Sequence, residues 1–186
     1  DLNKALQVIE RGTIKQIDGA TVNGRLFFCT AGIGFDAHIA NEFATSTKRG
    51  FVTYFKTTIK EFFNYSPSLY KINIDGKIIE TKAFLITVAN AGQWGNDVYI
   101  APEAELSDGI LNISILKPFS HFAIPMIGIK LFSKKINTSL SLQSEKGKHI
   151  EITFNGVLPV HFDGEPITAT DKLTISIMPL ALNVVC

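Results

Sequence analysis

Two carboxylates near the end of the chain, in VHFDGEPI (residues 160–167), have the residue types and spacing of an acid–base site. On a loop tip, Glu165 can accept the proton of a hydroxyl group while Asp163 orients that hydroxyl or a metal ion. The same residues also fit a tight turn, in which an Asp-Gly bend follows a strand and Pro166 keeps the next residues out of central strand pairing. Spacing alone does not separate these interpretations, and the adjacent His161 is more typical of a packed or exposed histidine than of a catalytic one.

A second candidate region is NAGQWGNDVYIAPEAELSDGILNISIL, which follows an apolar run. Loops carried by rigid sheets hold many binding sites, so we expect the segment around Asn96 and Asp97 to carry its side chains into a cleft. Further on, Asp108-Gly109 forms either a turn before the next strand or part of a metal site. One carboxylate is a small donor set for Mg2+, but this cation also accepts main-chain carbonyls and waters.

Two glycines in FFCTAGIGFDAHIANEF stand between an apolar strand and a helix. Gly32 and Gly34 indicate close backbone approach or an unusual φ at this point. Without an earlier strand–helix–strand unit they do not form a dinucleotide fingerprint, so an ordinary strand-to-helix turn remains the alternative. In that alternative Asp36 caps the helix.

Antiparallel sheet is predicted for most of the chain and must position these loops. Asn-Gly and Asp-Gly tolerate the positive φ of two-residue hairpins, and such pairs occur between apolar or alternating runs. These pairs are Asp18-Gly19, Asn23-Gly24, Asp75-Gly76 and Asn155-Gly156. Six or more strands at this spacing predict a mainly β (α+β) fold, either a sandwich or a barrel.

Helices are expected where this pattern breaks. Apolar spacing predicts a helical insertion near residues 36–65, in two pieces broken near Gly50. In HFAIPMIGIKLFSKK, Pro125 and Gly128 argue against a long regular helix. Residues 1–12 fit the tail of an amphipathic helix that stops at Gly12, so we expect residues 13–186 to form the domain itself.

The composition excludes several classes of protein. With 46% hydrophobic and 19% charged residues the chain is neither disordered nor rich in charge, and a net charge of +1 gives no basic field for nucleic acid. Cys29 and Cys186 lack metal-type spacing and fit reduced cytosolic thiols. The fourteen phenylalanines either fill the core or line a site for an apolar ligand.

Three motifs, in this order, resemble the carboxy-terminal half of the bacterial diacylglycerol kinase-like lipid kinases. They are VNGRLFFCTAGIGFDAHI, IAPEAELSDGILNISIL and FDGEP, and the likeness runs over nearly the whole chain. The resemblance implies that the fold is an antiparallel two-layer β-sandwich, not a barrel. This domain forms an active site in the cleft against an amino-terminal ATP-binding α/β domain. The GGDGT-type nucleotide motif of that other domain does not occur in this sequence, and Trp94 is unusually bulky for its loop.

The resemblance also implies roles for particular residues. Glu165 matches the proposed general base and Asp163 its acidic companion. Asp108, with the main-chain carbonyls of Glu105 and Ile110, matches a magnesium site. Gly32 and Gly34 match the glycine-bearing segment, which we expect on the cofactor side. Phosphoryl transfer requires mainly positioning, charge neutralisation by magnesium and a base, which agrees with this set.

The resulting hypothesis is the carboxy-terminal domain of a lipid kinase that transfers the γ-phosphoryl group of ATP to diacylglycerol or a similar lipid. Its cofactors are Mg2+ and ATP, and this chain alone is expected to be inactive. Two alternatives stay open: a non-catalytic lipid-binding or regulatory module, and an enzyme similar to NAD kinases.

The expected partners are a lipid at the membrane surface and the protein's own amino-terminal nucleotide-binding domain, not nucleic acid. A homodimer stays open. We expect a cytoplasmic protein that associates transiently with membranes through local apolar contacts, because its net charge is small.

Overall fold

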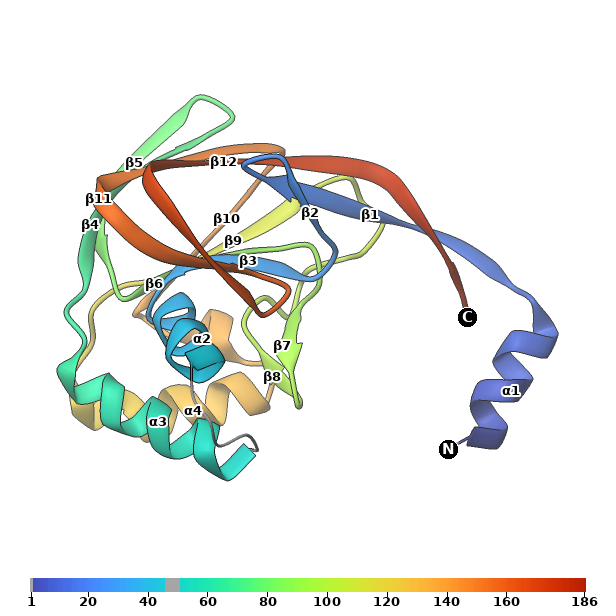
Figure 1. Cartoon of the computed structure of the whole chain (residues 1–186), viewed down its shortest axis with the longest axis horizontal. Helices are drawn as coiled ribbons and strands as arrows, with labels where there is room; N and C mark the ends of the chain where they lie inside the picture. The colour runs from blue at the N-terminus through green and yellow to red at the C-terminus, as the bar shows by residue number, and fades with distance from the viewer. Residues whose placement is uncertain (1, 46–50) are drawn as a thin grey trace.

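The computed structural model describes residues 2–45 and 51–186, and its main feature is a ten-stranded antiparallel sheet that bends into two layers (Figure 1). The strand order is β10-β9-β6-β3-β11-β12-β1-β2, and β4 joins β11 to β5. The strands are β1 (Ile14–Val22), β2 (Arg25–Phe27), β3 (Thr30–Gly34), β4 (Ser68–Ile74), β5 (Lys77–Ala83), β6 (Leu85–Ala89), β9 (Leu111–Leu116), β10 (Leu142–Gly147), β11 (His149–Phe162) and β12 (Glu165–Val185). The predicted two-layer antiparallel β-sandwich of α+β class is confirmed.

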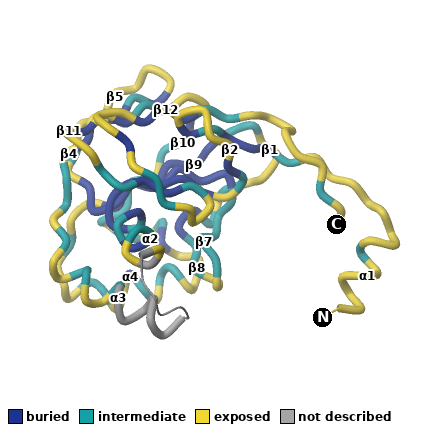
Figure 2. Tube along the Cα trace, in the orientation of Figure 1, coloured by how far each residue is buried: buried dark blue, intermediate teal, exposed yellow. Residues whose placement is uncertain are grey.

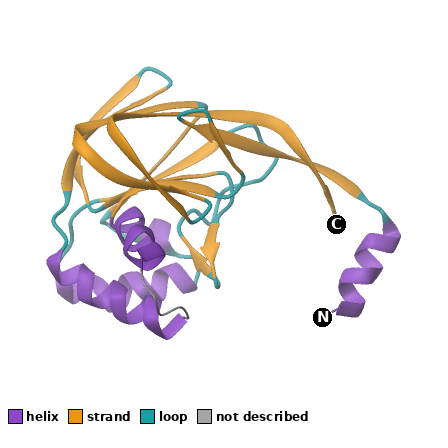
Figure 3. Cartoon of the chain, viewed as in Figure 1, coloured by secondary structure: helices purple, strands orange, loops and turns teal. Residues whose placement is uncertain are grey.

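A separate two-stranded sheet and a layer of helices complete the described chain (Figure 3). The small sheet consists of β7 (Gln93–Gly95) and β8 (Val98–Tyr99). The helices are α1 (Leu2–Arg11), α2 (Phe35–Thr45), α3 (Phe51–Asn64), α4 (Ile124–Phe132), and the 3-10 turns η1 (His121–Ala123) and η2 (Ile136–Thr138). In the described part of the chain, no helix has both the length and the apolarity needed to cross a membrane.

The long strand β11 makes the sheet bend. Its first half, Ile150–Thr153, lies between β12 and β4, whereas its last residues, Val160–Phe162, lie between β12 and β3. A register shift between Thr153 and Val157 separates the halves. A bulge of this kind bends and twists a strand, so β11 belongs to both layers and ends at the predicted catalytic turn.

Two apolar cores hold the layers in place. One lies between the two layers of sheet and includes Ile86 and Val88 of β6. The other lies between the sheet and the helices and includes Leu85 and Ala89 of the same strand. Side chains alternate across a strand, so β6 contributes to both cores and is buried along its whole length (Figure 2).

Aromatic residues fill much of the second core. The Phe84 ring has centroid distances of 4.6 Å to Phe35, 5.1 Å to Phe62 and 5.2 Å to Phe119. Part of the phenylalanine content therefore serves packing. Other phenylalanines, including Phe122, remain exposed.

Two of the predicted hairpin turns are confirmed. Asn23-Gly24 joins β1 to β2, with φ of 47° and 79°. Asp75-Gly76 joins β4 to β5, with φ of 49° and 94°. Positive φ at both residues is the geometry that two-residue hairpins require.

The other two predicted turns are wrong, because both dipeptides lie inside strands. Asp18-Gly19 sits at a register shift in β1, where Asp18 is only 1% exposed. Asn155-Gly156 sits at the irregularity in β11, and the Gly156 N–H donates to the Asp171 carboxylate at 2.9 Å. Glycine in a strand often marks such a bulge, and only the pairing of neighbouring strands distinguishes this from a turn.

The helix predictions are confirmed where the structure describes the chain. The insertion near 36–65 forms two helices, α2 and α3, as expected, whereas Gly50 lies outside the described residues. The second candidate segment is helical but contains no long regular helix, as expected, because it consists of the turn η1 and the nine-residue helix α4. Pro125 lies in its first turn, where a missing N–H costs little, and a side chain at Gly128 would meet open space.

The two ends of the described chain form an arm that projects from the body (Figure 1). The first residues of β1 pair with the last residues of β12, from Ile14 opposite Val185 onward. Beyond them α1 carries Leu2, Leu6 and Ile9, all exposed, and ends before Gly12 at a φ of 62°. A helix is therefore present at Leu2–Arg11, within the predicted segment, and none of its residues is buried.

A substitution at Gly34 tests how closely the backbones of β3 and β6 approach each other. Its φ is 111°, and a Cβ there would lie 2.8 Å from both Leu85 Cα and the Phe84 carbonyl oxygen. We expect Gly34→Ala to lower the free energy of unfolding by about 2–4 kcal/mol, measured by urea denaturation. The matched change Gly128→Ala, in a helix and in open space, should leave stability unchanged or raise it by about 0.5–1 kcal/mol. Equal stability of the two variants would contradict the close approach.

Candidate functional site

The predicted carboxylate pair lies on the hairpin between β11 and β12. Asp163 and Gly164 form its two-residue turn, with φ of 47° and 84°, and Glu165 is the first residue of β12. The expectation that Pro166 stays out of central pairing is confirmed, because it pairs with His161 on one side only. β1 joins β12 only from Ile175 onward, so β12 is an edge strand at Pro166, where proline is tolerated.

Asp163 holds the hairpin against the loop between β2 and β3. Its carboxylate accepts hydrogen bonds from the backbone N–H groups of Phe28, Cys29 and Thr30, at 2.8, 2.8 and 3.0 Å. Its own N–H donates to the Thr30 carbonyl at 2.8 Å. Bonds from N–H groups to a carboxylate are among the stronger hydrogen bonds in proteins. The carboxylate is therefore engaged in fixing the turn.

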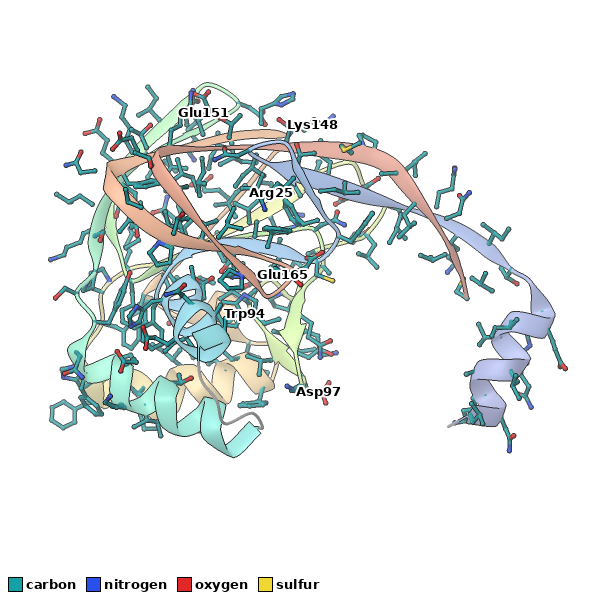
Figure 4. The ribbon with its side chains drawn as sticks, in the orientation of Figure 1. Arg25, Trp94, Asp97, Lys148, Glu151 and Glu165 are labelled. Atoms are coloured by element: carbon teal, nitrogen blue, oxygen red, sulfur yellow. The ribbon has the colours of Figure 1, made fainter. Side chains whose placement is uncertain are left out.

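Glu165 lies next to this anchored turn and is exposed (Figure 4). Its side chain has no hydrogen-bond partner among residues 2–45 and 51–186. A carboxylate with free lone pairs on a rigid turn can accept a proton from an incoming hydroxyl group. The structure thus gives the two carboxylates different positions, one bonded to the backbone and one open.

A buried polar cluster lies next to the turn, at the end of β11. His161 is 5% exposed, and its Nε2 lies 3.1 Å from Asp36 Oδ2, which also accepts a hydrogen bond from Thr87 Oγ1 at 3.0 Å. His161 is therefore a packed histidine, as expected. Asp36 lies in the first turn of α2, where its Oδ1 also accepts from the Ala37 N–H.

This cluster explains one of the two glycines. A Cβ at Gly32 would collide with Asp36 Oδ2 and would lie 2.6 Å from His161 Nε2. At Gly34, the backbone of β6 occupies the corresponding space. Packing accounts for both residues, and their assignment to cofactor binding stays a prediction.

The predicted magnesium loop lies between β8 and β9. Glu105 and Asp108 are exposed and Ile110 is half-buried; Asp108 Oδ1 accepts a hydrogen bond from the Ile110 N–H at 3.1 Å. Within the described ranges no three His, Cys, Asp or Glu side chains gather as a metal cluster. One carboxylate with main-chain carbonyls still fits a hard cation that keeps several waters, so the donor set is compatible with Mg2+.

Buried Asp18, which sequence reasoning missed, fixes this loop. Its Oδ2 accepts from the Gly109 N–H and its Oδ1 from the Leu180 N–H, both at 2.7 Å. The Asp18 N–H donates to the Leu106 carbonyl at 2.6 Å. The signal was a charged residue inside the alternating run IKQIDGATV, which we interpreted as a turn.

Asn90 connects the Asp108 loop to the turn that carries Asp163. Its side-chain amide donates to the carbonyls of Asp18 and Phe28, both at 2.8 Å, and its backbone N–H donates to the Cys29 carbonyl at 2.9 Å. Phe28 and Cys29 are in turn bonded to Asp163. One chain of hydrogen bonds therefore joins the two predicted parts of the site, which lie on different loops.

The expectation of a loop around Asn96 and Asp97 was wrong, because these residues form the turn of the β7–β8 hairpin. Both have positive φ, 49° and 59°. Asp97 lies at the outer tip, where it accepts a hydrogen bond from Gln93, and Trp94 packs against the second core (Figure 4).

Solved structures of known enzymes share this fold. A diacylglycerol kinase from Bacillus anthracis aligns with a TM-score of 0.72 at 20% identity, over 100% of this chain and 58% of that one. An NAD kinase from Archaeoglobus fulgidus in complex with ATP aligns with a TM-score of 0.55 at 10% identity, over 99% and 59%. At these identities the likeness concerns the fold alone.

Proteins that are similar to this chain in sequence carry the names of lipid kinases. A "Probable lipid kinase YegS-like" of Shewanella frigidimarina is 27% identical over 99% of this chain and 60% of its own length. The "Diacylglycerol kinase" of Bacillus subtilis is 24% identical over 89% of this chain and 55% of its own length. The chain thus spans less than two thirds of these relatives.

Residues 29–186 match the model of one family, described as the YegS C-terminal NAD kinase beta sandwich-like domain. The chain belongs to this family. The resemblance to diacylglycerol kinase-like lipid kinases that the three motifs indicated is therefore confirmed.

The buried position of Asp18 can be tested by an isosteric change. In Asp18→Asn an amide NH2 faces a backbone N–H donor, so we expect the free energy of unfolding to fall by about 2–4 kcal/mol in urea denaturation. The matched variant Asp171→Asn removes a carboxylate that accepts one N–H on the surface and should change stability by less than about 1 kcal/mol. Similar losses in the two variants would argue against a special role for Asp18.

Cys29 reports on the environment of the turn. Partial burial raises the pKa of its thiol above the ordinary value, and the nearby Asp163 charge raises it further. Because the thiolate is the reactive form, the pH midpoint for iodoacetamide alkylation should be higher in the native protein than in urea. A Cys186→Ser background leaves one thiol to follow, and a native midpoint at or below the unfolded one would contradict the described surroundings.

Proposed function

We propose that this chain is the carboxy-terminal domain of an ATP-dependent lipid kinase that phosphorylates the hydroxyl group of diacylglycerol or a similar lipid. The observation that carries the proposal is the open Glu165 carboxylate on a turn that Asp163 fixes through three backbone hydrogen bonds. The names of the relatives, lipid kinase and diacylglycerol kinase, support the same reaction.

In this proposal Glu165 accepts the proton of the lipid hydroxyl as its oxygen attacks the γ-phosphoryl group. Asp163 acts through position, because its oxygens are already bonded to backbone N–H groups. Asp108 and the carbonyls of Glu105 and Ile110 would hold Mg2+, which when bound neutralises negative charge near the reacting phosphate. Asp18 and Asn90 keep that loop in register with the turn.

The remaining part of the active site is assigned to an amino-terminal nucleotide-binding domain. The relatives extend well beyond the part that this chain matches. The exposed apolar face of α1 on the projecting arm is a suitable contact for that domain, with residues 13–186 as the sandwich domain. ATP would be bound mainly there, so we expect the chain alone to be inactive.

A lipid hydroxyl is preferred to NAD as the acceptor. The likeness to an NAD kinase extends to the fold alone, at 10% identity, whereas sequence relatives over nearly the whole chain carry lipid kinase names. A non-catalytic module of the same fold has no observation in its favour beyond the missing nucleotide motif.

Substitution of the proposed base gives the direct test. In the protein that joins this chain to its nucleotide-binding domain, we expect Glu165→Gln to lower kcat for transfer of labelled phosphate from ATP to diacylglycerol by about 10²–10⁴-fold. Glu151→Gln is the matched control, because Glu151 lies on the same hairpin and forms a surface ion pair with Lys172 at 2.6 Å. Unchanged turnover in Glu165→Gln would rule out this residue as the base.

A further inference from the structure

The outward face of α4 and the preceding turn η1 carries a stripe of large apolar side chains. Phe122 is 96% exposed, and Met126, Ile129 and Phe132 are between 56% and 63% exposed. Their spacing of four, three and three residues places them on one side of a helix. We call these four residues the α4 stripe.

The α4 stripe is unusual because the inward face of the same helix is apolar as well. Ile127 is buried, and Leu131 packs against the second core. A surface helix normally turns its polar side outward, and a helix that is apolar all round is covered on both sides. Contiguous exposed apolar residues mark surfaces that contact proteins or membranes.

Neighbouring elements extend the stripe into a surface. Phe63, at the end of α3, is exposed and lies 5.3 Å from His121 of η1, measured between ring centroids. Leu140, after η2, is fully exposed. Lys130 of α4 donates to the Thr138 carbonyl at 2.8 Å, which fixes η2 and α4 to each other. The α4 stripe, Phe63 and Leu140 therefore lie on elements that are fixed to one another.

Positive charge accompanies this surface. Residues 109–144 contain no Asp or Glu and four lysines, at 117, 130, 134 and 135. Lys134 and Lys135 follow the stripe directly and are exposed; Lys134 Nζ lies 4.3 Å from the centre of the Tyr99 ring. Glu103 accepts a hydrogen bond from Asn137 at 2.7 Å, so one carboxylate lies at this end and reduces the local field.

We propose that the α4 stripe and its lysines form a docking surface for an anionic lipid bilayer. Apolar side chains beside lysines on one helix face are the arrangement with which helices lie in a membrane interface. Charge complementarity favours a bilayer with anionic headgroups, because the segment offers lysines and no carboxylates of its own. The biological purpose of this docking rests on the proposed function. The evidence for the docking surface is the exposed apolar side chains and lysines, which do not depend on that function.

The size of one cavity near the helices agrees with this purpose. A cavity of about 190 Å³ lies between α2, β4 and β11, and serine and tyrosine side chains form part of its lining. Ligand pockets for drug-sized molecules have volumes of about 300–1,000 Å³. The acyl chains of a lipid do not fit this cavity, which agrees with a docked domain that leaves them in the bilayer.

Vesicle flotation of the 186-residue chain tests the proposal. We expect the chain to float with vesicles of phosphatidylcholine containing roughly one third phosphatidylglycerol, and to float less as salt rises. Phe122→Ser with Ile129→Ser should reduce the bound fraction by at least about tenfold. Lys134→Gln with Lys135→Gln should reduce binding to the anionic vesicles and remove its salt dependence.

The matched control is Leu69→Ser with Ile78→Ser, which changes two exposed apolar residues of the β4–β5 hairpin. This variant should bind vesicles as the unchanged chain does. Equal losses in both apolar variants, or no binding by the unchanged chain, would overturn the proposal. A stripe variant that converts a dimer to a monomer in sedimentation while still binding vesicles would also overturn it, in favour of a second copy of the chain.

The vesicles contain neither diacylglycerol nor ATP, so docking is measured apart from catalysis. Glu165→Gln should bind them normally. Vesicle binding together with full turnover in Glu165→Gln would retain the docking surface and reject the proposed base. Lost turnover in Glu165→Gln, with no vesicle binding by the unchanged chain, would retain the base and reject the docking surface.

Discussion

The backbone N–H groups of loops need hydrogen-bond acceptors, and this need determines how the domain is held together. Aspartate carboxylates are the acceptors at several places. Asp163 accepts three such groups and Asp18 two, while Asp75 accepts those of Lys148 and His149 at 2.8 and 2.9 Å. In the Asp75 case these bonds hold the pKa of the carboxyl below its ordinary value. Each aspartate thereby fixes a segment far away in the sequence, and the candidate site consists of loops fixed in this way.

Local sequence predicted those parts of the fold whose cause is local. Asn23-Gly24 and Asp75-Gly76 are hairpins because the chain reverses between strands that pair directly with each other. Asp18-Gly19 has the same chemistry but lies within a strand, since β1 continues alongside β12. Which outcome applies depends on a partner strand more than 150 residues away, and this information is not in the dipeptide.

The candidate site shows the same division. The motifs located the β11–β12 turn and the loop that carries Asp108, because turn chemistry and resemblance are visible in the sequence. The space around Gly32 is filled by Asp36 and His161. The need for glycine at this position could therefore be recognised only after three strands and a helix had been brought together. The roles of Asp18 and Asn90 depend on contacts across the sheet and were missed for the same reason.

The position of Asp18 has a mechanical consequence. It lies at the register shift in β1 where the projecting arm meets the body, and its carboxylate bonds both to Leu180 of the adjoining strand and to Gly109 of the Asp108 loop. The arm and the loop therefore share a pivot. A rotation of the arm would pull on the loop backbone through Asp18, so that the angle of the arm and the spacing of the oxygens around Asp108 would change together.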